Sequence, residues 1–290
     1  STGSAGCAGT DSAGKDSAGA DAALLPWRVR PLPSTVPWHL VPPATSGLVP
    51  LGLGGDDARP VGLDLTTHRR SVVIGPPRSG RTTALTLVAL QLAGHGVHAA
   101  LVATRGSWPD RLRGVPGLHL LTASDADQLR RLRQAHPAMS LLVDDADLLN
   151  GTAVEPAVLE ALAVSQHTGA WCVATVESRR AASLYRGLVP ELAREGAGVI
   201  LCPASPSDGD LLGIRVDPTH HRLPGRGVLV SHGEALPIQL ADPTTHPTPD
   251  PTTDPTTDPA TDPTTDPATD PPTTRQPASP THPTGNGLFT

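Results

Sequence analysis

The sequence has few cysteines, few aromatic residues and no long hydrophobic run. Its three cysteines, Cys7, Cys172 and Cys202, are too few and too scattered for a disulfide framework or a zinc site, which fits a reducing compartment. No apolar run approaches the ~18 residues of a membrane span, and no signal peptide is visible. We therefore expect a cytoplasmic segment that makes no direct contact with a membrane.

Both ends of the chain lack residues that could form a core. Residues 1–22 contain no Leu, Ile, Val or aromatic residue, and residues 242–290 repeat Asp-Pro-Thr/Ala-Thr, with Asp at every fourth position from Asp250 to Asp270. Proline at this density favours extended chain and forbids helix. We predict a disordered linker at 1–22 and a disordered tail at 242–290, which leaves residues 23–241 as one domain.

Lysine is almost absent, and the predicted domain carries no net charge. Lys15 stands alone against 21 Arg, and the seven Asp and one Arg of the tail account for the whole net charge of -6. A nucleic-acid-binding domain usually shows a basic stripe. The candidates for one are Arg111, Arg113, Arg130, Arg131 and Arg133. They form either a DNA track or a solvated surface, and we favour the solvated surface.

The most informative segment runs from Ser71 to Gly94. A β-branched apolar run is followed there by a Gly/Pro-rich loop and an apolar-periodic helix, which is the layout of a phosphate-binding loop. The pattern G-x-x-x-x-G-[K/R]-[S/T] is matched by Gly75, Pro76, Pro77, Arg78, Ser79, Gly80, Arg81 and Thr82. Glycines let backbone N–H groups and a helix N-terminus approach phosphate oxygens. We predict that these residues and Thr83 bind ATP.

Two residues at the end of this loop define the expected chemistry. Thr82 is expected to hold Mg²⁺, and Arg81 to reach the β- and γ-phosphates. The planar guanidinium is bulkier than the usual lysine ammonium, so Arg81 favours binding over catalysis. Alternatively, a general bias toward arginine replaced lysine by arginine at this position without any functional pressure. Both interpretations remain open.

Two further apolar runs end in polar residues. In the run 140–147, Asp144 is expected to join the Mg²⁺ shell and Asp145 to be the catalytic residue that orients or deprotonates the attacking water. The alternative is an acidic helix cap. In the run 171–177, Thr175 either senses the γ-phosphate or is only a good strand former.

The remaining pattern alternates between strands and helices, which predicts an α/β fold with nucleotide at the carboxyl ends of the strands. Strands are expected at 71–75, 97–104, 118–122, 141–144, 171–176 and 199–202, and helices at 80–93, 125–135, 153–167 and 179–194. A closing hairpin is expected across 225–239, with its turn marked by Gly225 and Gly227.

Five segments together resemble the FtsK/SpoIIIE branch of P-loop ATPases, above all the C-terminal modules of actinobacterial FtsK/SpoIIIE-like proteins and of the EccC component of type VII secretion. They are GPPRSGRTTAL, LLVDDAD, WCVATVES, GVILCPASPSDGDLLG and LPGRGVLV, and residues 48–65 are similar to the strand pair that precedes the loop in this family. The resemblance covers residues 32–240. It implies a RecA-like P-loop NTPase fold with a central, mainly parallel sheet, in a ring-forming motor that uses ATP and Mg²⁺.

One departure from the family concerns an arginine. Active members carry a Ser-Arg pair shortly before a Leu-Gly, and that arginine reaches the nucleotide of the neighbouring subunit. Here Asp208-Gly209 stands at the pair. Candidate substitutes for the trans arginine are Arg186, Arg194 and Arg226, and we favour solvated surface roles for all three.

Two functions follow. The first is a motor that hydrolyses ATP in a ring of identical chains, or beside other ATPase modules of the same chain, and moves double-stranded DNA or a secreted protein. The second is a degenerate module that recognises a partner without ATP turnover, which Arg81, Asp145 and Gly209 favour. Because the chain begins at Ser1 without a methionine, we also expect a preceding part with membrane spans or further ATPase modules.

Overall fold

The computed structural model describes residues 29–104, 108–219 and 223–245. The predicted linker at 1–22 lies outside the described residues, as does the predicted tail from residue 246 onward. The described part continues past Ala241, because the last strand includes Asp242 and is followed by a 3₁₀ turn, η6 (Pro243–Thr245), in which Pro243 is buried. Among the described residues, no helix is long and apolar enough to cross a membrane.

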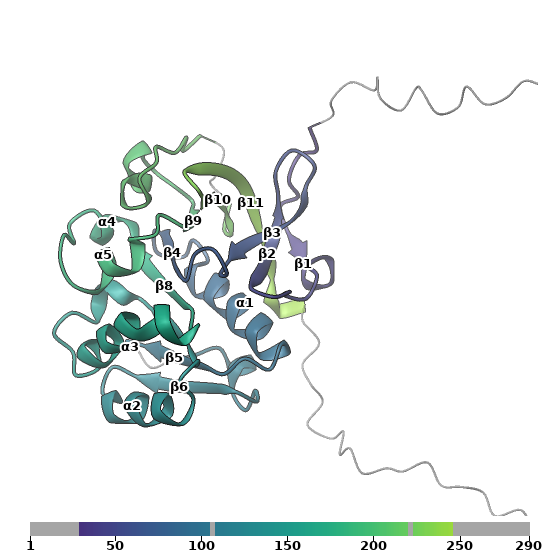
Figure 1. The fold of residues 1–290 in the computed structure, drawn as a ribbon. Helices are drawn as coiled ribbons and strands as arrows, with labels where there is room; N and C mark the ends of the chain where they lie inside the picture. The colour runs from purple at the N-terminus through teal and green to yellow at the C-terminus, as the bar shows by residue number, and fades with distance from the viewer. Residues whose placement is uncertain (1–28, 105–107, 220–222, 246–290) are drawn as a thin grey trace, which may run out of the picture. The chain divides into compact units, whose positions relative to one another are not determined.

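An 11-stranded sheet forms the centre of the molecule (Figure 1). Its order is β3-β2-β11-β10-β9-β4-β8-β7-β5-β6, and β1 pairs with β11 outside this path. The strands are β1 (Val36–Pro37), β2 (Leu48–Gly54), β3 (Arg59–Asp64), β4 (Arg70–Gly75), β5 (Ala99–Ala103), β6 (Leu118–Thr122), β7 (Ser140–Asp144), β8 (Cys172–Glu177), β9 (Gly198–Leu201), β10 (Arg226–Ser231) and β11 (Glu234–Asp242). Strands β4 to β9 pair with one another in parallel. The pairs β9–β10, β10–β11, β11–β2 and β2–β3 are antiparallel. The predicted α/β class with a mainly parallel sheet is confirmed.

Helices cover both faces of the parallel strands. Side chains alternate along a strand, so Val72 and Ile74 of β4 join one core cluster while Val73 joins the other. The first cluster packs against α2 (Ala126–Ala135), α3 (Glu155–Thr168) and α5 (Leu188–Ala193). The second packs against α1 (Arg81–Gly94) and the N-terminal strands. Every residue of β4 is buried, as expected for a strand covered on both faces.

The predicted single helix at 179–194 is wrong. The segment contains two short helices, α4 (Ser178–Ala181) and α5, and the non-helical residues 182–187 separate them. Gly187 precedes α5 with φ 89°, a conformation that glycine adopts readily. Pro190 then lies in the first turn of α5, where its missing N–H costs nothing; inside one long helix it would break a backbone hydrogen bond.

The turn of the closing hairpin was also placed wrongly. Strands β10 and β11 are joined at His232 and Gly233, which have φ 53° and φ 77°. Positive φ at both central residues is the pattern of the tight turn that matches the twist of a two-stranded ribbon. Gly227 lies inside β10 instead, where an added Cβ would meet the Ile200 carbonyl oxygen at 2.1 Å.

Candidate nucleotide site

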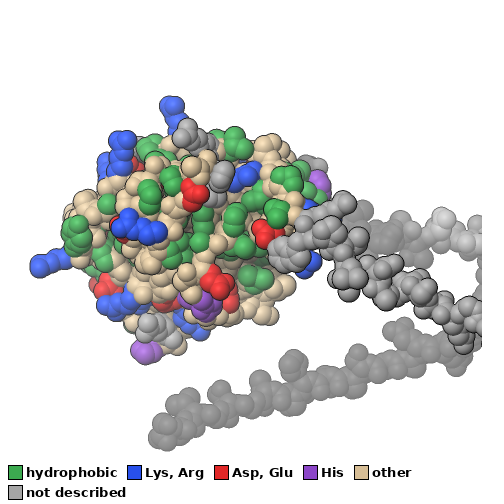
Figure 2. All heavy atoms as spheres, turned by 90° about the horizontal axis from the view of Figure 1, so that it is seen from above, with side chains coloured by type: hydrophobic (Ala, Val, Ile, Leu, Met, Phe, Trp, Pro, Cys, Tyr) green, Lys and Arg blue, Asp and Glu red, His purple; other side chains and the backbone are tan. Residues whose placement is uncertain are grey.

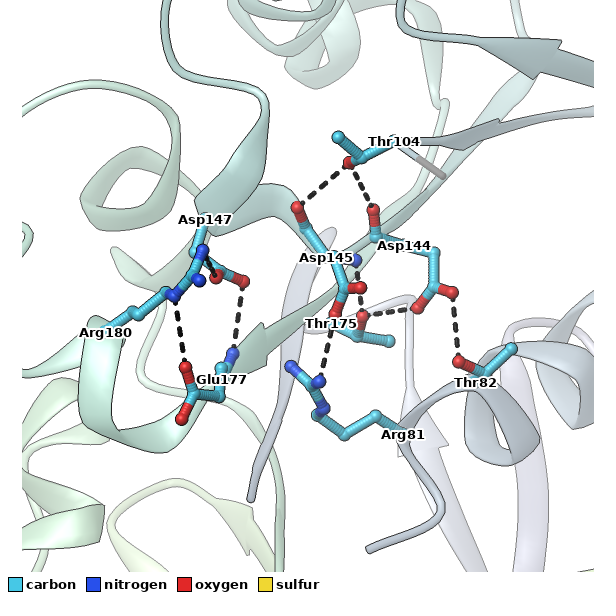
Figure 3. Close-up of polar contacts among 9 residues, drawn as sticks. All are labelled: Arg81, Thr82, Thr104, Asp144, Asp145, Asp147, Thr175, Glu177 and Arg180. Carbon is cyan, nitrogen blue, oxygen red and sulfur yellow. Dashed lines mark hydrogen bonds and ion pairs between the residues drawn. The ribbon is translucent and has the colours of Figure 1, made fainter. Parts of the chain in front are cut away.

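The strand order brings three predicted site segments to one edge of the sheet. Strand β8 lies between β4, which leads into the phosphate-binding loop, and β7, which ends at Asp144. All three strands are parallel, so their carboxyl ends lie at the same edge. Figure 3 shows the side chains that meet there.

The phosphate-binding loop depends on its two glycines. Gly75 ends β4, and an added Cβ would meet Ser79 Oγ at 2.4 Å and the Leu201 carbonyl oxygen at 3.0 Å. Gly80 has φ 102° and precedes the first residue of α1. The N-terminus of this helix therefore faces the loop. Its free N–H groups and its dipole favour a bound anion.

Residues 223–227, the segment LPGRG, contact this loop through backbone hydrogen bonds. The N–H of Gly225 donates to the Ser79 carbonyl at 2.9 Å, and the Gly225 carbonyl accepts from Leu240 N at 2.8 Å. The loop is thereby tied to β11. A cavity of about 220 Å³ opens beside these contacts, lined by Val36, Gly80, Thr83, Gly225 and Leu240 among others.

Asp144 stands at the centre of a chain of hydrogen bonds. Its Oδ2 accepts from Thr82 Oγ1 at 3.0 Å, and its Oδ1 accepts from Thr175 Oγ1 at 2.6 Å. The Thr175 hydroxyl in turn accepts from the Asp145 N–H at 2.8 Å. The structure thus joins both predicted Mg²⁺ residues, Thr82 and Asp144, through direct contacts. Thr175 is fully buried in β8 and holds the Asp144 carboxylate through this hydrogen bond.

The two remaining key residues, Arg81 and Asp145, contact each other. Arg81 Nη2 lies 3.0 Å from Asp145 Oδ1, and both side chains are mostly buried, with exposed fractions of 14% and 21%. Asp145 adopts the left-handed conformation with φ 49°, which Asp tolerates better than most residues. Arg81, which was expected to contact the phosphates, is therefore paired with Asp145, which was expected to orient the attacking water.

Burial governs the electrostatics of this site. Desolvation raises the pKa of Asp144, although hydrogen bonds from Thr175 and Thr82 act in the opposite direction. Ser79 Oγ and Arg81 Nη1 are buried without a hydrogen-bond partner. A buried carboxylate beside unpartnered donors fits a ligand that carries both a divalent cation and phosphate oxygens. Thr82 and Asp144 would hold Mg²⁺, and Ser79 and Arg81 would face the phosphates.

Four residues near the site had no assigned role in the sequence interpretation. Thr104 Oγ1 donates to the carbonyl oxygens of Asp144 and Asp145, both at 3.3 Å. Asp147, whose side chain is 2% exposed, accepts from the Glu177 N–H and pairs with Arg180, which also pairs with Glu177. The sequence pointed to Asp147 only as the third acidic residue of the string DDAD at 144–147. The partners that Asp147 meets come from β8 and α4, which no local pattern identifies.

The position of the trans arginine is occupied by structural residues. Asp208 accepts from the N–H groups of Ala204 and Ser205 and so caps η5 (Pro206–Leu212). Gly209 is buried, and an added Cβ would meet the Ile214 carbonyl oxygen at 2.5 Å. The backbone packs too closely here for an arginine side chain.

The candidate substitutes do not share one environment. Arg226 is held inside the fold by Gln239 and by the carbonyls of Leu32 and Pro33, so the expected solvated role is wrong for this residue. Arg194 is exposed and pairs with Glu191. Arg186 is exposed.

The candidates for a DNA track are largely engaged in other contacts. Arg113 pairs with Asp110, and Arg130 pairs with Asp127 and Glu160. Arg111 donates to the Pro243 carbonyl, Arg133 is half-buried and Arg131 is exposed. On the face drawn in Figure 2, basic side chains are scattered among hydrophobic, acidic and polar ones.

No family model and no curated protein matches the chain. Solved structures do match its fold. ATPases 2 and 3 of Thermomonospora curvata EccC, in complex with a signal sequence peptide, are 22% identical with a TM-score of 0.61, over 73% of this chain and 44% of that chain. The cytoplasmic domain of EssC is 16% identical with a TM-score of 0.63, over 73% and 48%.

A third similar structure is the conjugation coupling protein TcpA of pCW3, in its monomer form with ATPγS. It is 13% identical with a TM-score of 0.54, over 74% of this chain and 72% of that chain. The chain thus spans less than half the length of the EccC and EssC chains it matches. These likenesses confirm, at the level of the fold, the resemblance carried by the motifs: the chain has the fold of the FtsK/SpoIIIE-type P-loop ATPase domains.

Proposed function

We propose that this chain is an ATP-binding domain of a larger FtsK/SpoIIIE-type motor assembly, and that it holds ATP with Mg²⁺ while hydrolysing it slowly or not at all. The observation that carries the proposal is the junction of loop and acidic strand: Thr82 and Thr175 both donate to Asp144, while Asp145 is paired with Arg81. The first contact prepares a cation site. The Arg81–Asp145 pair engages the two side chains that would otherwise assist hydrolysis.

The nucleoside would lie in the cavity of about 220 Å³ beside the loop. Gly80 of the loop and Thr83 of α1 line it, together with Ser34 and Thr35 of the N-terminal segment and Gly225. The cavity therefore adjoins the residues expected to bind the phosphates. Mg²⁺, when bound, would neutralise phosphate charge next to Asp144.

Slow turnover follows from three features. The planar Arg81 replaces a lysine and is engaged by Asp145, and Gly209 stands where a trans arginine is expected. That arginine alone is worth about 10³ to 10⁵ in rate in enzymes that use it. A motor role for the whole assembly would then require hydrolysis in other modules or other chains.

For the partner, we propose other ATPase modules or copies of this chain, together with a protein substrate in preference to double-stranded DNA. Three of the five basic residues that could form a DNA track, Arg113, Arg130 and Arg111, are paired with acids or engaged with backbone. The similar EccC structure contains a signal sequence peptide. We propose a cytoplasmic location, as part of a membrane-anchored protein.

The second candidate, a module that binds a partner without nucleotide, is favoured by the closed Arg81–Asp145 pair. Calorimetric titration with ATP, with and without Mg²⁺, separates the two. We expect one ATP per chain, with an affinity that depends on Mg²⁺ in the wild type and not in Thr82→Ala. No heat of binding at millimolar ATP would leave the partner-binding module as the function.

A further inference from the structure

Three histidines lie together at the end of the sheet opposite the nucleotide site. His98 precedes β5, His119 lies in β6, and His136 follows α2, close to the amino ends of the parallel strands. One candidate ligand atom from each imidazole lies within 4.8 Å of those of the other two. The rings of His98 and His136 are stacked, with centroids 4.1 Å apart, and the His119 ring lies 5.9 Å from that of His98.

The backbone fixes these residues independently of their rings. His119 is the ladder partner of Ala100 in the parallel pairing of β5 and β6. The His98 carbonyl accepts from Ser140 N at 2.9 Å, and His136 N donates to the Leu132 carbonyl at 2.8 Å. Three separate elements therefore deliver the imidazoles to one place.

The cluster has unmet bonding capacity. His119 Nε2 is buried and has no hydrogen-bond partner among the described residues. Neither an acidic residue nor a cysteine belongs to the group, so nothing in it offers a counter-charge for protonated rings. Burial, and then the neighbouring His98 and His136, lower the pKa of His119. Neutral imidazole is the form that binds metal ions.

We propose that His98, His119 and His136 form a binding site for a divalent transition metal, with Zn²⁺ as the preferred ion. Imidazole ligands suit Zn²⁺, and three histidines with one open position are a known coordination pattern for it. Zn–N distances of about 2.0–2.1 Å place tetrahedral donor atoms about 3.3 Å apart. The candidate donor atoms lie within 4.8 Å of one another, so binding would require ring rotations that bring them closer, and His98 is exposed while the other two are half-buried.

The open coordination position would face a cavity of about 470 Å³. His98, His136, Met139 and Trp171 line it, so a water molecule or a carboxylate ligand reaches the metal from that side. Strand β6 is the last strand of the sheet. A metal bound here would cross-link this edge strand to β5 and to the end of α2, and would stabilise the native state by mass action.

The test is a calorimetric titration of untagged, EDTA-treated and dialysed protein with ZnCl₂. We expect one Zn²⁺ per chain and a rise in melting temperature. His98→Asn and His136→Asn should each weaken binding by tenfold or more. The matched control is His39→Asn, an exposed histidine outside the cluster, which should bind Zn²⁺ as the wild type does.

Co²⁺ provides a second readout, since its visible absorption reports tetrahedral coordination. We expect that absorption in the wild type and His39→Asn, and its loss in His119→Gln. Because His119 is partly buried, far-ultraviolet circular dichroism of each variant checks folding, and the exposed His98→Asn carries the decision if His119→Gln misfolds. Equal Zn²⁺ affinity in His98→Asn, His136→Asn and His39→Asn would overturn the proposal.

Discussion

Arg81 and Asp145 stand where a phosphate-binding cation and a water-orienting acid are expected, and in this structure they contact each other. The ion pair occupies Arg81 Nη2 and Asp145 Oδ1, so it limits how fully either group can act on a nucleotide. A partly desolvated pair of this kind resists separation, because breaking it leaves two buried charges without a partner. Binding of ATP therefore competes with an internal ion pair.

This competition predicts that Asp145→Asn tightens ATP binding, by up to about tenfold, which corresponds to ~1.4 kcal/mol. The substitution frees Arg81 for phosphate. The measurement is the dissociation constant for ATP with Mg²⁺. Glu177→Gln is the matched control, because it removes the same charge near the same edge from a residue paired with Arg180 instead. An equal or weaker affinity in Asp145→Asn than in the control would contradict the competition.

Thr175 gives a second prediction at this scale. Thr175→Val leaves a buried oxygen of Asp144 and the Asp145 N–H unpaired, which should cost about 1–3 kcal/mol in the free energy of unfolding. It should also raise the pKa of Asp144 further, since the Thr175 hydrogen bond lowers it. Denaturant unfolding measures the loss. Thr175→Ser keeps the hydroxyl and should retain most of the stability; equal losses in both variants would refute the role of the hydroxyl.

Spacing alone predicted Thr82 and Asp144, because a phosphate-binding loop and an acidic strand each have a local pattern. The contact between Asp144 and Thr175 could not be predicted in this way. It requires β8 to lie beside β7, and strand order is a property of long-range packing. The Arg81–Asp145 pair depends on side-chain geometry that no spacing encodes.

At the scale of elements, short apolar runs bounded by turn residues were the easiest strands to predict, whether buried as in β4 or at the sheet edge as in β6. The expected strand at 118–122 coincides with β6, and that at 71–75 differs from β4 by one residue. Errors arose where one residue changes the direction of the chain. Gly187 and Pro190 divide the expected long helix, and the His232-Gly233 turn was overlooked because Gly225 and Gly227 are more prominent in the sequence.

The end of β11 leads to a prediction about truncation. The Thr245 hydroxyl accepts from Trp38 N at 2.6 Å, and the Pro243 carbonyl accepts from Arg111. Ending the chain after Ala241 removes these contacts and should lower the melting temperature by several degrees, since ~1 kcal/mol shifts it by about 2–4 °C in a domain of this size. Ending it after Thr245 is the matched control and should change stability by less than ~0.5 kcal/mol. Identical melting curves for the two truncations would be the contrary result.

The turn after β3 leads to a prediction about pH. Asp64 accepts hydrogen bonds from Thr66 and Thr67, and the Thr66 hydroxyl contributes most to lowering its pKa from 3.8 to about 2. A lowered folded-state pKa gives stability that is complete above pH ~4 and is lost as the pH falls toward 2. Asp64→Asn should therefore lower the melting temperature at pH 7, and the difference should vanish near pH 2. A difference that is independent of pH would contradict this assignment.

At the scale of the whole molecule, the residues proposed to hold Mg²⁺ contact each other, whereas the groups expected to complete hydrolysis are engaged elsewhere. Gly209 allows a close backbone contact with Ile214, Asp208 caps η5, and Arg226 ties the hairpin to the N-terminal segment. Gly209 stands where the resemblance places the trans arginine, Asp208 stands at the other position of that pair, and Arg226, a candidate substitute, holds the fold together instead. The account therefore predicts a domain that retains unhydrolysed nucleotide.

The most direct test of that claim is to identify the nucleotide that the protein retains. Protein is incubated with equimolar ATP and Mg²⁺ for several hours, separated from free nucleotide, denatured, and analysed chromatographically. The account predicts that close to one nucleotide is recovered per chain and that it is still ATP, whereas Thr82→Ala retains little. Recovery of ADP from the wild type, or of no nucleotide at all, would contradict it.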